Sequence, residues 1–413
     1  MLMNRKLLIT TKGSVLFIIA VLITACASKK KNLENITSNQ ERLSNSKIAA
    51  IFQVEKQQLS YAWKTVKRKG KLPRSIDKGY RPIDDWTSGF YPGNLWLVYE
   101  YTHDQNIKRN AEYATALLEE EKYNTRDHDI GFRIYCSYGN GYRLTQSSHY
   151  KDVIIQAAES AIQRYSPKVK AIMSWEPNSD RDWQFPVIID NMINLELLFA
   201  ATHATGDSIY YKIAVDHAIT TMKNQFRDNY SCSHVVDYDS ITGQFRKMDW
   251  NNGNNDPSIA VWSRGQSWGL YGYTMMFRET GDKQFLIHAE KIADFILNHP
   301  NMPKDMIPYW DYSTPEIPTA RDASAAAIMA SALMELSGFS PTHSKRYFEA
   351  GEKILESLSS STYLAQSGTN GNFLLKHATG NFVRKSEVDG TLIYADYYFL
   401  EALLRYTDIK KMF

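Results

Sequence analysis

The chain has 413 residues, with 48 Lys and Arg against 45 Asp and Glu, which gives a formal net charge of +3. Its first 25 residues hold three basic side chains and no acid, so the remainder carries 48 − 3 − 45 = 0. A chain without a basic excess has no electrostatic support for nucleic-acid binding. Three cysteines and no Cys-x-x-Cys pair argue against a disulfide framework and a zinc site, so we expect no metal and a buried free thiol at Cys136 and Cys232.

Residues 1–25 have the pattern of a bacterial signal peptide. Basic residues precede an apolar run, Val15–Leu22, that is shorter than the roughly 20 residues of a membrane span. The run ends in Ile23-Thr24-Ala25-Cys26, which matches a lipobox. We therefore predict secretion across the inner membrane and lipidation of Cys26. The lipid would be the sole membrane attachment, and the protein would face the periplasm or, alternatively, the cell surface. An ordinary signal peptide or an uncleaved anchor is the competing interpretation.

Residues 26–45 are rich in Lys, Asn and Ser and predict a flexible tether. Beyond it, residues 46–413 contain no Pro/Gly-rich linker, which favours one large domain. Apolar residues recur at helical spacing in twelve segments. These are approximately 46–67, 91–103, 107–121, 130–144, 148–164, 191–204, 208–225, 261–279, 283–298, 320–336, 343–358 and 391–407.

The predicted helices differ in character. Segment 191–204 is apolar nearly all round, as a helix buried on both sides would be, whereas 208–225 is amphipathic. Apolar helices alternating with amphipathic ones predict an inner and an outer ring, hence an all-α fold, an (α/α)6 barrel. Strand signals are sparse, and one small hairpin is expected between Phe373–His377 and Phe382–Arg384. A helical superhelix is the alternative, but no sequence repeat of fixed period supports it.

Two aspartates, Asp129 and Asp190, each begin an apolar segment. Asp is a favoured N-cap, so either carboxylate could simply accept helix amides. Asp190 follows three apolar residues and a loop with Trp175 and Trp183, which suggests a poorly solvated site beside a sugar-binding surface.

A third block, Trp262-Ser263-Arg264-Gly265-Gln266-Ser267-Trp268, places two Trp and an Arg at a helix start. The planar guanidinium of Arg suits bidentate recognition of a carboxylate, and Trp suits a sugar face. An Arg paired with a structural Asp beside two core Trp is the alternative. His234 is ambiguous in the same way.

Taken together, these blocks resemble glycoside hydrolase family 88, the unsaturated glucuronyl hydrolases. The matching strings occur in family order between residues 85 and 398. They are Asp85-Trp86-Thr87-Ser88-Gly89-Phe90-Tyr91-Pro92-Gly93, His128-Asp129-Ile130-Gly131-Phe132, Ile189-Asp190-Asn191-Met192, the Trp262–Trp268 block, Arg321-Asp322-Ala323-Ser324-Ala325-Ala326, Ser386-Glu387-Val388-Asp389 and Tyr394-Ala395-Asp396-Tyr397-Tyr398.

The resemblance implies an (α/α)6 barrel without a cofactor. It implies that Asp190 is the general acid/base and that Asp129 is a second essential carboxylate that holds sugar hydroxyls. The family's sugar pocket maps onto Trp86, His128, Trp175, His234, Arg264 and Trp268. One stretch departs from the family pattern, Gly253-Asn254-Asn255-Asp256, and it bears on substrate choice more than on reaction type.

The implied substrate is an oligosaccharide whose non-reducing end is a 4,5-unsaturated glucuronic acid left by a polysaccharide lyase. Hydration of its C4=C5 vinyl ether would release the uronic acid, and one carboxyl group could donate and then recover a proton. We expect the pKa of Asp190 to be raised by poor solvation and by the second carboxylate. Three rivals are an unsaturated rhamnogalacturonyl hydrolase acting on pectin fragments, a non-catalytic glycan-binding lipoprotein and a sugar epimerase with paired His bases.

Overall fold

The computed structural model describes residues 43–249, 256 and 258–412. The predicted signal peptide, Cys26 and most of the tether lie outside the described residues, as do three of the four residues of the stretch that departs from the family pattern. Contacts divide the chain into residues 1–44 and a unit from Asn45 to Phe413, and only the second is described below. In the described part of the chain, no helix is long and apolar enough to span a membrane.

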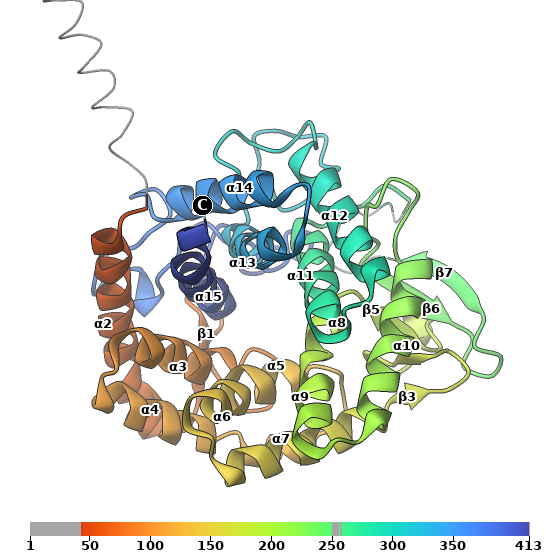
Figure 1. Cartoon of the computed structure of the whole chain (residues 1–413), viewed down its shortest axis with the longest axis horizontal. Helices are drawn as coiled ribbons and strands as arrows, with labels where there is room; N and C mark the ends of the chain where they lie inside the picture. The colour runs from red at the N-terminus through yellow and green to blue at the C-terminus, as the bar shows by residue number, and fades with distance from the viewer. Residues whose placement is uncertain (1–42, 250–255, 257, 413) are drawn as a thin grey trace, which may run out of the picture. The chain divides into compact units, whose positions relative to one another are not determined.

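All twelve predicted helical segments are present in the unit that begins at Asn45, and Figure 1 shows them as two concentric rings. The outer ring consists of α2 (Asn45–Lys69), α4 (Gln105–Ala116), α7 (Ser148–Ile162), α10 (Ser208–Asn224), α12 (Lys283–Leu297) and α14 (Ser344–Leu358). The inner ring consists of α3 (Phe90–Thr102), α5 (Ile130–Ile134) continuing through the π-helical turn η2 (Tyr135–Gly139) into α6 (Asn140–Thr145), α8 (Asn191–Asn194) with α9 (Glu196–Thr205), α11 (Ser263–Thr280), α13 (Ala323–Phe339) and α15 (Ile393–Ile409).

The inner ring is closed. Each inner segment contacts the next one along the chain, from α3 to α13, and α15 then packs against both α13 and α3. Segments that are buried on all sides need apolar side chains around their whole circumference, and α13 shows this most fully, because 14 of its 17 residues are buried. The predicted (α/α)6 barrel is confirmed.

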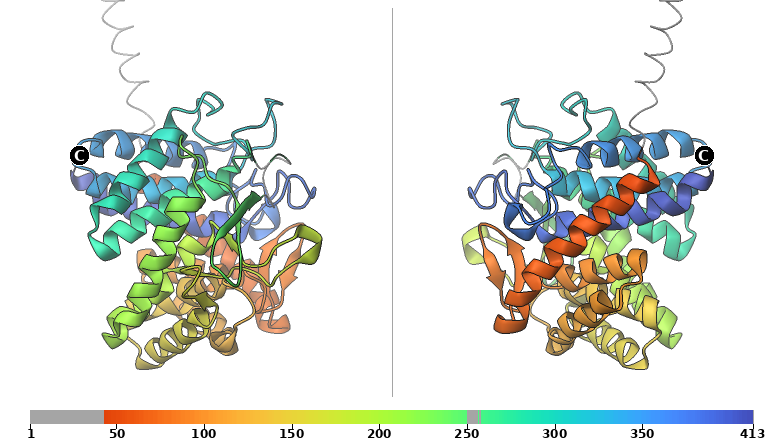
Figure 2. Two further views of the ribbon diagram at one scale, coloured as in Figure 1. Left: turned by 90° about the vertical axis from the view of Figure 1, so that its right-hand side faces the viewer. Right: turned by 90° about the vertical axis from the view of Figure 1, so that its left-hand side faces the viewer.

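Short strands and long loops gather at one end of the barrel (Figure 2). The strands are β1 (Leu72–Ser75), β2 (Gly79–Arg81), β3 (Tyr165–Ser166), β4 (Ala171–Ile172), β5 (Pro186–Ile188), β6 (Val235–Tyr238) and β7 (Phe245–Asp249). The first four form two hairpins, and the last three form an antiparallel sheet in the order β5-β6-β7. Single 3₁₀ turns occur at η1 (Glu119–Tyr123), η3 (Ser179–Arg181), η4 (Asn370–Asn372) and η5 (Lys410–Met412).

The hairpin expected between Phe373–His377 and Phe382–Arg384 is wrong. The backbone N–H groups of Leu374 and Leu375 donate to the buried carboxylate of Asp396 on α15, at 3.0 and 2.8 Å, rather than to another strand. The apolar residues of this segment are buried against the barrel, and the expected partner residues form a loop.

Cys136 and Cys232, the two cysteines within the described residues, are free and buried, as expected.

Candidate active site

A cavity of about 540 Å³ opens at the end of the barrel where the inner helices begin. Residues that line it come from five of the six inner segments or the turns before them, from the β1–β2 hairpin, from β5 and the loops before β5 and β6, and from the loop 380–387. They are Arg74, Lys78, Trp86, Asp129, Trp175, Ile188, Asp190, His234, Trp262, Arg264, Gly380, Asn381, Arg384, Ser386, Glu387 and Tyr394. Helix N-termini carry a partial positive charge, so a pocket at this end of the barrel favours an anionic ligand.

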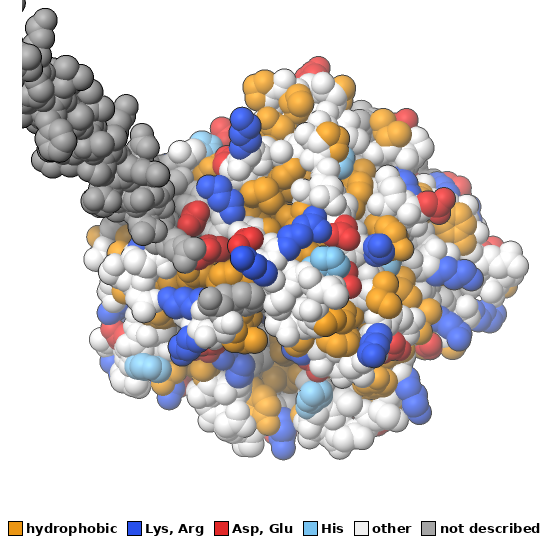
Figure 3. Space-filling model, turned by 45° about the horizontal axis from the view of Figure 1, so that its top comes forward, with side chains coloured by type: hydrophobic (Ala, Val, Ile, Leu, Met, Phe, Trp, Pro, Cys, Tyr) orange, Lys and Arg blue, Asp and Glu red, His pale blue; other side chains and the backbone are white. Residues whose placement is uncertain are grey.

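The surface around the molecule offers no comparable preference on the face seen in Figure 3, where acidic, basic and apolar side chains are interspersed. That face therefore adds no electrostatic preference to the preference of the pocket itself.

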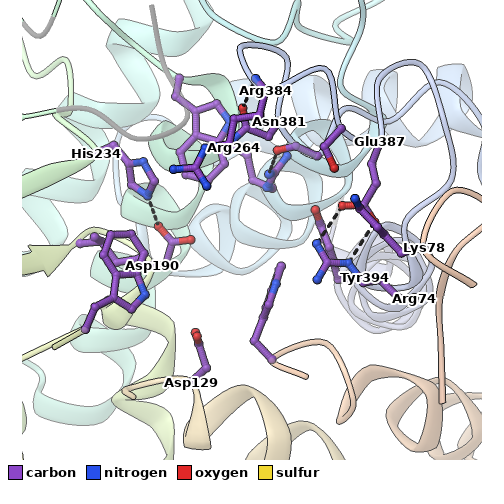
Figure 4. Close-up of a pocket in the computed structure, with 16 residues that line it drawn as sticks. Arg74, Lys78, Asp129, Asp190, His234, Arg264, Asn381, Arg384, Glu387 and Tyr394 are labelled. Carbon is purple, nitrogen blue, oxygen red and sulfur yellow. Dashed lines mark hydrogen bonds and ion pairs between the residues drawn. The ribbon is translucent and has the colours of Figure 1, made fainter. Parts of the chain in front are cut away.

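Asp129 and Asp190 occupy the N-cap positions of α5 and α8, but neither carboxylate caps its helix. Their ψ angles are 6° and −28°, far from the extended backbone at which an N-cap side chain reaches the helix amides. Asp104 and Asp282, by contrast, have ψ angles of 117° and 116° and do accept N–H groups of the outer helices. The interpretation of the two acids as simple caps therefore fails, and both carboxylates project into the cavity (Figure 4).

Asp190 is placed by the antiparallel pairing of β5 with β6. Ile188 pairs with Val235, and the N–H of Ile189 donates to the carbonyl of His234 at 3.1 Å. The side chains of Asp190 and His234 therefore leave the sheet at the same edge. The Nε2 atom of His234 lies 3.4 Å from Oδ2 of Asp190. The imidazole ring is held against Trp262, with ring centroids 4.5 Å apart.

Asp129 lies in a cluster of like charges. Burial is the main cause that raises the pKa of Asp129 well above its ordinary value, and the charge of Asp127 is the next. Asp190 and Asp85 raise this pKa further, whereas Arg133 lowers it. His128 is buried beside it, with Nε2 at 3.4 Å from Asp129 Oδ1, and burial lowers the pKa of this histidine to about 4. At neutral pH His128 is therefore uncharged and offers Asp129 no counter-charge.

Arg264 reaches the cavity, and both terminal nitrogens of its guanidinium hold partners, whereas its buried Nε has none among the described residues. One terminal nitrogen donates to Asp322 at 2.7 Å and to the carbonyl of Thr379, and the other donates to the carbonyl of Gly380 at 2.7 Å. These contacts match the alternative, an Arg paired with a structural Asp, and the bidentate grip on a uronate stays a prediction. Its visible effect is to tie the loop 380–387 to the start of α11 and α13.

Of the remaining predicted binding residues, the structure brings Trp86, Trp175 and His234 to the pocket surface. His128 lies behind Asp129 rather than on that surface. Trp268 is 0% exposed and packs in the core between Phe132 and Tyr398, with ring centroids 5.4 and 5.2 Å away. The prediction that Trp268 contacts sugar is not supported by this position.

Sequence reasoning missed the β1–β2 hairpin on the opposite rim. Arg74 binds Glu387 through two hydrogen bonds of 3.0 and 2.8 Å, and Ser75 donates to the same carboxylate at 2.6 Å. Lys78, in the turn between β1 and β2, lines the cavity next to this clamp. Glu387 and Tyr394 lie within strings that match the family, which could have flagged them, whereas Arg74 and Lys78 carry no motif.

Comparison with known proteins agrees with this geometry. The family model of Glycosyl Hydrolase Family 88 matches residues 64–398. The chain belongs to glycoside hydrolase family 88. It is 50% identical over 326 residues to an unsaturated glucuronyl hydrolase of Formosa agariphila, which covers 78% of this chain and 80% of that one.

Two further relatives illustrate the range of similarity. An unsaturated chondroitin disaccharide hydrolase of Streptococcus pneumoniae is 32% identical, over 81% of this chain and 85% of that one. The crystal structure of an unsaturated glucuronyl hydrolase specific for heparin superimposes with a TM-score of 0.85 at 44% identity, over 89% of this chain and 99% of that one.

Proposed function

We propose that this member of family 88 removes a 4,5-unsaturated glucuronic acid from the non-reducing end of lyase-generated oligosaccharides. The observation that carries the proposal is the pair of carboxyl groups, Asp129 and Asp190, that face one cavity without capping their helices. The names of the relatives in the previous section support the same class of substrate.

The chemistry begins with a proton. A carboxyl pair in a poorly solvated pocket holds one proton more readily than none, because two neighbouring charges disfavour each other. Asp190 delivers its proton to C4 of the vinyl ether, and the positive charge that forms at C5 is shared with the ring oxygen. Asp129, on the adjacent helix, holds the sugar hydroxyls in register.

Water then adds at C5, and its proton returns to Asp190, which restores the starting state. The C5 hemiketal opens by breaking the bond between C5 and the ring oxygen, which leaves a ketone at C5 and a hemiacetal at C1. Collapse of that hemiacetal releases the rest of the oligosaccharide as an alcohol. One carboxyl group thus acts first as acid and then as base.

The pocket surface suits such a substrate. Trp175 stacks on Trp183 with ring centroids 5.7 Å apart, which holds an aromatic platform beside His234. Aromatic faces of this kind pack against sugar rings. Lys78 adds a cationic group on the opposite rim for the negatively charged uronate.

The rivals fare less well. Among the described residues that line the cavity, His234 is the one histidine, so a pair of His bases for an epimerase is missing there. A glycan-binding protein needs no uncapped carboxyl pair, and the match to family 88 favours glucuronyl over rhamnogalacturonyl substrates. We further propose that the chain works downstream of a polysaccharide lyase, since lyase elimination creates the C4=C5 double bond. A lipid on Cys26 would hold it at the membrane.

The central test is Asp190→Asn. The amide retains the shape but cannot deliver a proton, so turnover should fall by ~10²- to 10⁴-fold. Loss of ultraviolet absorbance by the conjugated double bond measures turnover. Hydrolysis by the wild-type protein in deuterated water should place deuterium at C4.

Asp282→Asn is the matched control, because Asp282 caps the outer helix α12 and its amide replacement can still cap. It should leave turnover unchanged. Near-full activity of a folded Asp190→Asn protein, or product without deuterium at C4, would reject the mechanism. A wild-type protein that binds unsaturated disaccharides without consuming them would support the glycan-binding alternative.

A further inference from the structure

Helix α5 receives its N-terminal cap from another helix. The Oδ1 atom of Asn194, on α8, accepts the N–H of Phe132 at 2.7 Å. Phe132 is the third residue of α5, which begins directly after the N-cap residue Asp129. The N–H of a residue at this position is one that an N-cap side chain normally binds. Asn194, 62 residues away in the sequence, thus caps α5 in place of Asp129, the residue at the N-cap position.

The geometry around Asn194 is tight. A Cβ atom at Gly131 would lie 2.5 Å from Asn194 Oδ1 and 2.6 Å from its Cα, so the two helices approach this closely because residue 131 has no side chain. The amide nitrogen of Asn194 donates to the carbonyl of Asp190 at 3.4 Å, a long contact within its own helix. One buried side chain therefore contacts both helix starts that carry the two carboxyl groups.

We infer that Asn194 is a positioning residue that caps α5 in place of Asp129 and so leaves the Asp129 carboxyl group facing the substrate. The inference rests on the proposed function, because it assigns a role within that same site. Without Asn194 the N–H of Phe132 is buried and unsatisfied. At the N-cap position, the Asp129 carboxylate can replace Asn194 as the acceptor once ψ of residue 129 turns from 6° towards the extended value, and the helix dipole draws the carboxylate the same way.

If the Asp129 carboxylate accepted the N–H of Phe132, its pKa would change as well as its position. A carboxylate that accepts a backbone N–H is favoured in its charged form, so its pKa falls. The charged and titratable groups that face Asp129 are Asp127, His128, Arg133, Asp190 and Asp85, and none of them is altered by a change at residue 194. Because activity requires one proton on the pair, a lower pKa moves the high-pH limb of the rate profile to lower pH.

The test uses two substitutions at one position. Asn194→Ala removes the acceptor, and we expect kcat to fall ~10- to 100-fold, the scale of a misplaced reacting group, with a much smaller change in KM. Its high-pH limb should move to lower pH. Asn194→Asp keeps an oxygen that can cap α5 and adds a negative charge, so it should recover much of kcat and move the same limb to higher pH.

Asn94→Ala serves as the control for packing, since Asn94 is buried in inner helix α3 and contacts neither carboxyl group. It should lower the melting temperature without moving the pH profile. A crystal structure of Asn194→Ala should show the Asp129 carboxylate bonded to the N–H of Phe132, which tests the inference without any activity. Unchanged kcat and pH profile in folded Asn194→Ala, equal shifts in both Asn194 variants, or an unmoved Asp129 would overturn it.

Discussion

Replacing Arg264 by Met removes a buried cation while a side chain of similar length stays in place. The guanidinium contacts Asp322, which is fully buried, and the carbonyl oxygens of Thr379 and Gly380. Breaking a buried ion pair by removing one partner costs about 3–5 kcal/mol, because the other charge is left without compensation. For a unit of about 370 residues this corresponds to a fall in Tm of ~4–6 °C.

The same change should raise KM, because the loop that carries Asn381 and Arg384 loses its tie to α11. Asp322→Asn separates this cause from a direct grip on the uronate. Asp322 does not line the cavity, and Asn can still cap α13, so this variant keeps Arg264 but removes the carboxylate that holds its guanidinium against the carbonyls of Thr379 and Gly380. Both variants should therefore lower Tm and raise KM together, as followed by calorimetry and by the absorbance assay.

Arg346→Met provides the control, since Arg346 forms a surface ion pair with Asp294 and its side chain is 39% exposed. Such pairs contribute roughly 0–1 kcal/mol, so little change is expected. If Arg264→Met raised KM at an unchanged Tm while Asp322→Asn changed neither quantity, Arg264 would bind the uronate directly and the reasoning above would be refuted.

Three further predictions address the other site residues and the anchor. Asp129→Asn should be more stable than the wild-type protein at pH 7–8. The raised pKa of Asp129 stabilises the wild-type fold fully below the unfolded pKa of about 3.9, and this stability is lost as pH rises through the folded pKa. A Tm difference between variant and wild type that stays constant down to pH 4 would contradict this. Trp268→Phe should lose about 1–3 kcal/mol of stability with an unchanged KM, and the opposite pattern in calorimetry and kinetics would return Trp268 to the sugar pocket. Cys26→Ser should release active protein from membranes, and fractionation that finds it retained like the wild type would disprove the lipid anchor.

The barrel could be predicted because its two rings leave different marks on the sequence. Inner segments such as α13 are apolar all round, while outer segments such as α14 carry one apolar face, and both patterns are local. The sheet that positions Asp190 leaves no such mark. Strand β5 has three residues and pairs with β6 at a distance of 47 residues, from Ile188 to Val235, so no turn signal joins them.

The candidate site was predictable in its acids and less so in its cations. Asp129 and Asp190 stand in motifs at helix starts, and both face the cavity. Arg264 and Arg74 are the same residue type, and nothing local in the sequence tells which carboxylate each will meet. Their partners Asp322 and Glu387 are brought close by the ring closure and by the loop 380–387, which are properties of the whole fold.

A raised pKa does not by itself identify the reacting carboxyl groups in this barrel. Burial raises the pKa of Asp396 to about 7 although two backbone N–H groups donate to it, and it raises the pKa of Glu196 to about 7 although Arg278 lies 2.5 Å away. Neither side chain lines the cavity that holds Asp190. Asp129 combines a raised pKa with a carboxylate that leaves its helix uncapped and points into that cavity. Access to a sugar ring, rather than the perturbation of a titration, therefore assigns the chemistry to the pair at the N-terminal ends of the inner helices.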